Sequence, residues 1–176
     1  MYLNMRKLKI EKKKRDFAIH LHILLGIVLL MIYSAEASSM AWGSLVLCSQ
    51  FNGKLVKKDG TPASGITITR HWKWGWNDDS DTATTVSDEQ GNFSFKQVNG
   101  SSFTARLMPH EPSVKTEITA TYKDQEVTLF SVQKKNYDAD GELVGQNLSG
   151  PGINLECVLD QEPNPDGPFW GTCRAK

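Results

Sequence analysis

Hydrophobic residues in this chain come in short bursts that alternate with polar residues and are separated by turn residues. After residue 37 no stretch keeps a helical 3.6-residue period over three turns, whereas alternation with a period of two is typical of half-buried strands. Gly and Asn mark turns at residues 58–62, 88–91, 99–100 and 140–141. The pattern predicts strands at Ser44–Val56, Gly65–Trp76, Thr82–Ser87, Phe93–Gln97, Ser102–Leu107, Val114–Tyr122, Glu126–Lys134 and Ile153–Leu159. Many short strands with such turns indicate a sandwich or an open barrel.

The first 37 residues follow a different order. Seven Lys/Arg at positions 6–15 precede an apolar run at 17–33, and Ala35-Glu36-Ala37 matches the small-x-small pattern that signal peptidases accept. The uninterrupted apolar centre, Ile23–Ile32, is shorter than the roughly 20 residues needed to span a membrane. We therefore expect an N-terminal signal helix, cleaved as a signal peptide of residues 1–37, with an uncleaved membrane anchor as the alternative. The protein is then periplasmic or secreted, or anchored to the inner membrane.

Charge and length restrict what the remaining residues can be. Seven of the 20 basic and three of the 20 acidic residues lie at positions 1–37, which leaves 13 and 17 afterwards and a net charge of −4. A mildly acidic domain does not offer the basic stripe that nucleic acid requires, so we expect no nucleic-acid partner. Residues 38–176 have the length of one domain with its own core.

Three cysteines remain to be placed. Cys157 and Cys173 flank a segment rich in Pro and Gly, and in an oxidising compartment they can close this C-terminal loop as a disulfide. Cys48 lies in an apolar run and is expected to be a buried thiol. A lipid anchor on Cys48 is the alternative, but Leu47 is bulky where a bacterial lipobox has a small residue.

Three segments resemble a known plan: residues 51–56 (FNGKLV), 59–68 (DGTPASGITI) and 84–95 (TTVSDEQGNFSF). Their order is similar to the "G-x-V, D-G-x-P-x-x-G-x-x-V, T-x-x-D-x-x-G-x-F-x-F" order of carboxypeptidase regulatory-like, or transthyretin-like, β-sandwich domains. The resemblance covers residues 51–95 and includes no catalytic residue. It implies an all-β, transthyretin-like (immunoglobulin-like) sandwich for residues 38–176 and a non-catalytic module of an exported protein.

The part after residue 107 resembles small bacterial exported proteins. This resemblance is carried by residues 109–112 (PHEP), residues 135–143 (KNYDADGEL) and the closing Cys157 and Cys173 pair. It implies a bacterial origin and export, and it implies no activity.

Trp72, Trp74 and Trp76 alternate with Lys73 and Gly75, so in an extended strand the three rings lie on one face. They are the candidate binding residues. Exposed, they would form a platform for a protein partner or, as a less favoured partner, a glycan. The favoured interpretation is that they pack in the sandwich core or under the loop of residues 78–81.

Asn136, Asp138 and Asp140 followed by Gly141 match the first half of a calcium loop. The second half of the segment does not match that motif, because Asn147 lies at the position where a calcium loop has a bidentate Glu. Since Asp-Gly is also an ordinary hairpin turn, we expect a turn and no metal site.

A catalytic site finds little support in the residues. After the signal only His71 and His110 remain, and neither lies in a recognised metal motif; no nucleophile elbow, P-loop or dinucleotide fingerprint is present. We expect no enzyme and no cofactor. The expected function is a non-catalytic exported binding or structural module. The alternatives are an accessory or immunity-type protein that binds a secreted effector, and a hydrolase that uses His71 or His110.

Overall fold

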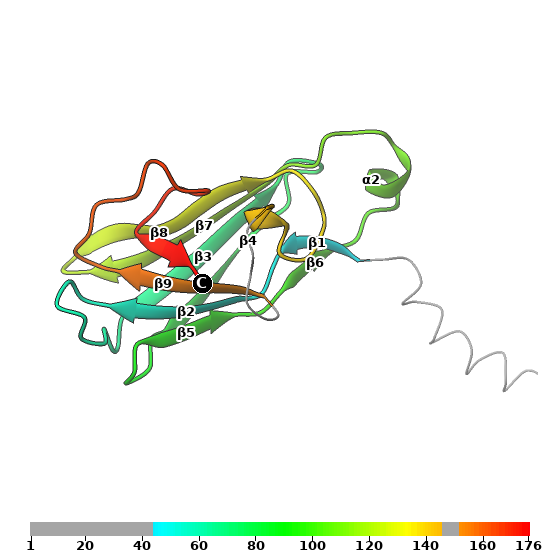
Figure 1. The fold of residues 1–176 in the computed structure, drawn as a ribbon. Helices are drawn as coiled ribbons and strands as arrows, with labels where there is room; N and C mark the ends of the chain where they lie inside the picture. Colours follow the sequence, from blue (N-terminus) through cyan, green and yellow to red (C-terminus); the bar gives the residue numbers. More distant parts are fainter. Residues whose placement is uncertain (1–43, 146–151) are drawn as a thin grey trace, which may run out of the picture. The chain divides into compact units, whose positions relative to one another are not determined.

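Residues 44–145 and 152–176, which the computed structural model describes, are mostly in strands (Figure 1). The predicted signal peptide lies outside these residues. Within the described part of the chain, no helix is long and apolar enough to cross a membrane. The all-β class predicted from the alternating pattern is confirmed.

The strands form two four-stranded sheets and a small two-stranded one. The first sheet has the order β10 (Cys173–Ala175), β9 (Ile153–Val158), β2 (Phe51–Val56), β5 (Asn92–Phe95). The second has the order β4 (Ser80–Val86), β3 (Thr67–Trp74), β7 (Val114–Tyr122), β8 (Gln125–Lys134). The small sheet pairs β1 (Leu45–Cys48) with β6 (Val98–Gly100).

The register of the strands decides which side chains face inward. In the second sheet, β3 and β7 pair antiparallel from Thr67↔Thr121 to Trp74↔Val114, and alternate residues of both strands are buried. In the first sheet, β2 pairs antiparallel with β5 but parallel with β9. Because side chains alternate across a strand, each sheet has one apolar inner face.

The two inner faces meet in one core, so the architecture is sandwich-like (Figure 1). The Phe51 ring of β2 contacts the Phe130 ring of β8 edge-on, with centroids 5.1 Å apart. Phe95, Ile118 and Ile153 belong to the same buried cluster. Burying one such side chain contributes about 1.5–3 kcal/mol, so this cluster is the main source of stability.

A second apolar cluster lies where the small sheet covers one end of β3 and β7. It combines Leu45 and Leu47 of β1, Trp72 and Trp74 of β3, and Val114 of β7. The short helix α2 (Phe103–Leu107) adds Ala105 to this cluster.

The predicted strands differ from the structure in several places, and three differences concern the candidate site. Residues 102–107 form α2 instead of a strand, because the Ser102 side chain caps the helix by accepting a hydrogen bond from the Ala105 amide (3.1 Å). The predicted strand at 44–56 is divided into β1 and β2, since Ser49 turns away to bind Glu142. The strand predicted at 65–76 ends at Trp74.

Candidate functional site

The structure separates the three candidate tryptophans. Trp72 and Trp74 are buried, with 8% and 1% of their surface exposed, on the face of β3 that the small sheet covers. Trp76 lies beyond the end of β3, in the turn before β4, and is half-buried. Trp72 and Trp74 thus pack in the core, which is the interpretation that the sequence favoured, and they form no exposed platform with Trp76.

A chain of hydrogen bonds connects Trp74 to His110. The Trp74 indole N–H donates to Tyr137 Oη (2.9 Å), and Tyr137 Oη lies 2.8 Å from His110 Nε2. His110 Nδ1 lies 2.9 Å from the Met108 carbonyl, which can only accept, so Nδ1 carries the proton. Tyr137 thereby links the Trp74 indole to the His110 ring. The ring of Trp76 covers His110 at a centroid distance of 4.3 Å.

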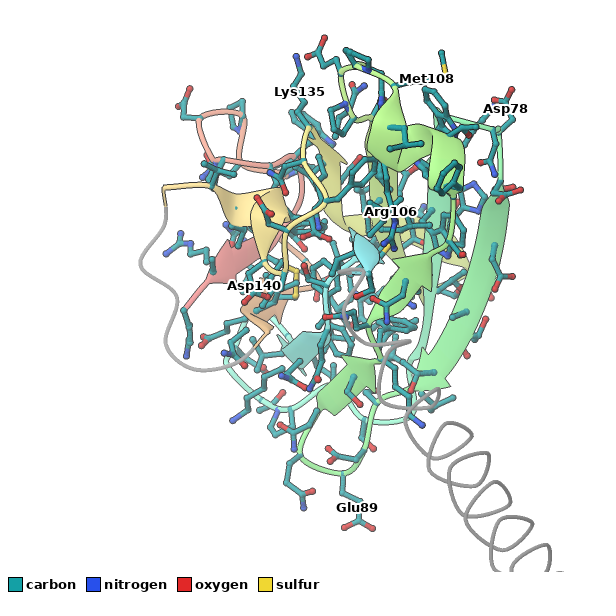
Figure 2. The ribbon with its side chains drawn as sticks, turned by 90° about the vertical axis from the view of Figure 1, so that its right-hand side faces the viewer. Asp78, Glu89, Arg106, Met108, Lys135 and Asp140 are labelled. Carbon is teal, nitrogen blue, oxygen red and sulfur yellow. A yellow bond between two sulfur atoms is a disulfide. The ribbon has the colours of Figure 1, made fainter. Side chains whose placement is uncertain are left out.

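Beside these hydrogen-bonded residues, α2 and its C-cap expose three large apolar side chains. Phe103, Leu107 and Met108 have 65%, 61% and 57% of their surface exposed. Figure 2 shows Met108 at the end of the domain where Asp78 and Lys135 also lie. We call Phe103, Leu107 and Met108, together with the adjoining Trp76 and His110, the α2 surface. Large apolar residues exposed together are typical of interaction sites.

The α2 surface is absent from the candidates expected from the sequence. Reading residues 102–107 as a strand puts Phe103 and Leu107 on one face of a sheet, where they would be taken as core. The signal that could have found the helix was Ser102 as an N-cap before two apolar residues four positions apart.

A fully buried ion pair lies between β8 and the 3₁₀ helix η1 (Gly141–Leu143). Lys134 Nζ is 3.3 Å from Glu142 Oε2, and neither side chain is exposed. The Ser49 amide and hydroxyl donate to the two carboxylate oxygens of Glu142 at 2.8 and 2.5 Å. The pair therefore connects the distant β1–β2 link to the end of β8 and to η1.

The calcium-like loop is a turn stabilised by its own side chains. Asn136 Oδ1 accepts from the Asp138 amide (3.0 Å), and Asn136 Nδ2 donates to the Gly141 carbonyl (3.0 Å). Lys134 Nζ donates to the Asp138 carbonyl (2.5 Å), so an ammonium occupies the position of a cation. Within the described ranges no group of three His, Cys, Asp or Glu could hold a metal ion, and Asn147 lies outside those ranges.

Cys48 and Arg70 are buried between the sheets. Burial raises the pKa of the Cys48 thiol to about 11, although a contact with Thr116 Oγ1 (3.3 Å) acts in the opposite direction. Burial also lowers the pKa of Arg70, whose guanidinium donates to the Lys96 carbonyl (2.8 Å) and lies 5.0 Å from the Phe95 ring centroid. A protonated thiol in this position is a poor nucleophile.

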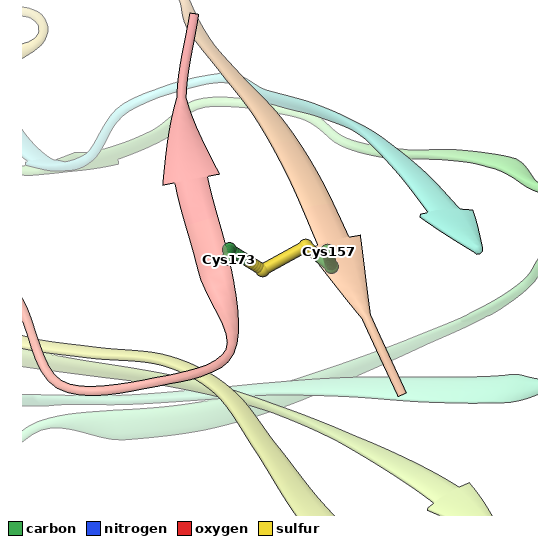
Figure 3. Close-up of a disulfide and its surroundings, with 2 residues drawn as sticks. All are labelled: Cys157 and Cys173. Carbon is green, nitrogen blue, oxygen red and sulfur yellow. A yellow bond between two sulfur atoms is a disulfide. The ribbon is translucent and has the colours of Figure 1, made fainter. Parts of the chain in front are cut away.

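The predicted disulfide between Cys157 and Cys173 is present in the structure. The two cysteines lie directly opposite each other on β9 and β10, as Figure 3 shows. They close the loop of the C-terminal segment, which returns to β8 through backbone hydrogen bonds between Trp170 and Ser131.

The two histidines do not lie together with a catalytic acid in the described residues. His71 is exposed on β3, and its Nδ1 lies 3.1 Å from Thr82 Oγ1. His110 is hydrogen-bonded to Tyr137 and to the Met108 carbonyl. Neither ring has a carboxylate partner among its hydrogen bonds, so the arrangement lacks the third group that orients a catalytic base.

The fold and the surface described above define an all-β, sandwich-like domain with an exposed apolar end. Residues 51–162 match the family model described as "Domain of unknown function (DUF6795)", and the chain belongs to this family. No curated protein matches the chain.

Among solved structures, a 9R-lipoxygenase from Cyanothece PCC8801 is similar at 16% identity over 69% of this chain. The chain covers 18% of that lipoxygenase, and the TM-score is 0.27. A TM-score this low supports no inference about fold or activity.

Proposed function

We propose that the protein is an exported, non-catalytic binding module with a transthyretin-like sandwich, and that its partner is another protein. The observation that carries the proposal is the exposure of three large apolar side chains, Phe103 and Leu107 of α2 and Met108 at its C-cap. The order of turn and strand motifs in residues 51–95 supports the transthyretin-like assignment, and the disulfide is compatible with an oxidising compartment.

The α2 surface has the composition of a protein-binding site. Its apolar side chains project from a helix that Ser102 caps and Ala105 attaches to the core. Trp76 and His110 add a half-buried pair of rings in tilted contact, and aromatic rings frequently carry much of the binding energy. The acidic net charge disfavours an anionic lipid surface. An apolar groove on a protein fits this surface best.

Photo-crosslinking in the exporting cell tests the proposed partner. A photoreactive residue at Leu107 should give one discrete adduct, which mass spectrometry identifies. Glu89 is the matched control, because Figure 2 shows it at the end of the domain opposite Met108. The same adducts from both positions, or none from Leu107, would refute binding through α2.

Export is tested separately by fractionation and N-terminal sequencing. A mature chain that begins at Ser38 in the periplasm or medium supports a cleaved signal, whereas a membrane-bound chain that retains residues 1–37 supports the anchor. A full-length chain in the cytoplasm would refute export.

A further inference from the structure

One sheet edge of the sandwich is long and uncovered. The edge of β8 is covered by the C-terminal segment through Ser131 and Trp170, while β10 and β5 span only three and four residues. The remaining edge strand, β4, spans seven residues and pairs with β3 alone. Among the four edges of the two large sheets, β4 is therefore the one that offers a full strand length to another chain.

Every second residue of β4 directs its backbone groups away from β3. The Trp74 amide donates to the Asp79 carbonyl (2.7 Å), and the Ser87 amide donates to the Ile66 carbonyl (3.0 Å). In an antiparallel ladder these bonds alternate along the strand, so the backbone N–H and C=O groups of residues 80, 82, 84 and 86 point away from β3. The Thr82 amide is bound locally by the Asp81 carboxylate (2.7 Å), which leaves the amides of residues 80, 84 and 86 directed to the outside.

The sequence of β4 carries only one of the usual protections of an edge strand, the charged Asp81 near its start. Residues 80–86 (SDTATTV) include no Pro and no Lys, and the register with β3 runs without a bulge. Thr and Val favour extended pairing. The Val86 side chain at the end of the strand is 57% exposed.

A hollow adjoins this end of β4. It has a volume of about 550 Å³ and is lined by Thr85 and Val86 of β4, by Asp88, and by residues 92–94 of β5, 52–54 of β2 and 154–155 of β9. A side chain from an added strand can enter this hollow while the backbones pair. In strand addition, backbone bonds supply affinity and such pockets supply specificity.

We propose that β4 binds an extended segment of the partner protein as an additional antiparallel strand. This inference rests on the proposed function, since it names how the partner is held. Asp78, Asp79 and Asp81 are exposed at the start of β4, and Lys73 forms an ion pair with Asp78 (2.9 Å). The remaining negative charge favours basic residues at the end of the segment that lies beside Ser80. Extended pairing favours β-branched residues in the rest of the segment.

A synthetic peptide tests the proposal on the full chain in a mild detergent. The probe is an acetylated Thr-Val-Thr-Val-Thr-Lys-Lys amide, whose lysines lie beside Ser80 when it pairs antiparallel. Hydrogen exchange of the Ser80, Thr84 and Val86 amides should slow at least about tenfold on binding, because each gains a strand hydrogen bond. The same peptide N-methylated at the residues facing β4 should leave exchange unchanged.

Two variants at one position control for folding. Thr84→Pro removes an outward amide that β3 does not use, and it should weaken peptide binding at least about fivefold. Thr84→Ala keeps the amide and should bind within about twofold of wild type. Unaltered binding by a folded Thr84→Pro variant, or equal protection by the N-methylated peptide, would overturn the proposal. If Thr84→Pro does not fold, the N-methylated peptide alone decides.

The outcomes also separate this inference from the proposed function. If the peptide does not slow exchange of the three amides while Leu107 still crosslinks to a partner, strand addition is refuted and the proposed binding function stands. A dimer of this chain that protects the same three amides without peptide would replace the partner by a second copy and overturn the proposal. Protection by the peptide without any crosslinked partner would refute the proposed function alone.

Discussion

Replacing Lys134 by methionine removes the ammonium from a pair that is entirely shielded from water. The side chains of Lys134 and Glu142 have no exposed surface, and methionine keeps most of the apolar length of the lysine. The variant leaves the Glu142 carboxylate with the two donors of Ser49, and it removes the donor to the Asp138 carbonyl. An uncompensated buried charge and a lost hydrogen bond then act together.

The expected cost is large relative to the stability of a domain. Removing one partner of a buried ion pair costs about 3–5 kcal/mol, against a total unfolding free energy of about 5–15 kcal/mol. For a domain of this size, Lys134→Met should lower the thermal midpoint by about 10–15 °C. Lys134→Met combined with Glu142→Leu should recover most of the loss, because it removes both charges from the interior.

Urea unfolding followed by tryptophan fluorescence measures both variants. The control is Lys135→Met: the neighbouring Lys135 pairs with Glu111, and both side chains are largely exposed, so its cost should stay below about 1 kcal/mol. A cost below about 1 kcal/mol for Lys134→Met would refute the reasoning, as would a double variant whose loss equals the sum of the single ones.

Three further predictions concern the cysteines and the calcium-like loop. Replacing Cys157 and Cys173 together by serine should cost about 3 kcal/mol in urea unfolding, because the disulfide closes a loop of about 15 residues; an unchanged urea midpoint would contradict this. Burial raises the pKa of the Cys48 thiol from 9.0 to about 11. The contribution of this thiol to the unfolding free energy is therefore full below pH 9 and is lost as the pH rises to 11. The unfolding free energy of wild type relative to Cys48→Ala should therefore fall between pH 9 and 11, and a flat difference would disprove it. Added calcium should leave the thermal midpoint unchanged, because the Lys134 ammonium already binds the Asp138 carbonyl; a calcium-dependent rise would show a metal site.

Strands with a long alternating pattern and marked ends were predictable from the sequence. The prediction of β7 at 114–122 matches the structure, because nine alternating residues end at a tight turn. Lys123 and Asp124 both adopt positive φ in that turn, as a two-residue hairpin requires. The short strands β6 and β10 were not predictable, since three residues carry no period and depend on a partner elsewhere in the chain.

The candidate site shows a different limit of prediction from the sequence. Alternation placed Trp72 and Trp74 on one face of a strand, and they do lie on one face. It could not show that β1, β6 and α2 cover this face, because those contacts are set by residues distant in sequence. The Lys134–Glu142 pair was hidden for another reason, because charged residues are expected at the surface unless a partner is known.

The parallel pairing of β2 with β9 has a consequence for the order of assembly. Phe51 pairs with Ile153 and Val56 with Val158, so the centre of the first sheet joins segments about a hundred residues apart. As the chain is synthesised, β2 can pair with β5 early but leaves its other edge open until β9 appears. Closing so long a loop is slow, and an open strand edge invites wrong partners in the meantime. The last quarter of the chain therefore determines when the domain becomes resistant to proteases and to aggregation.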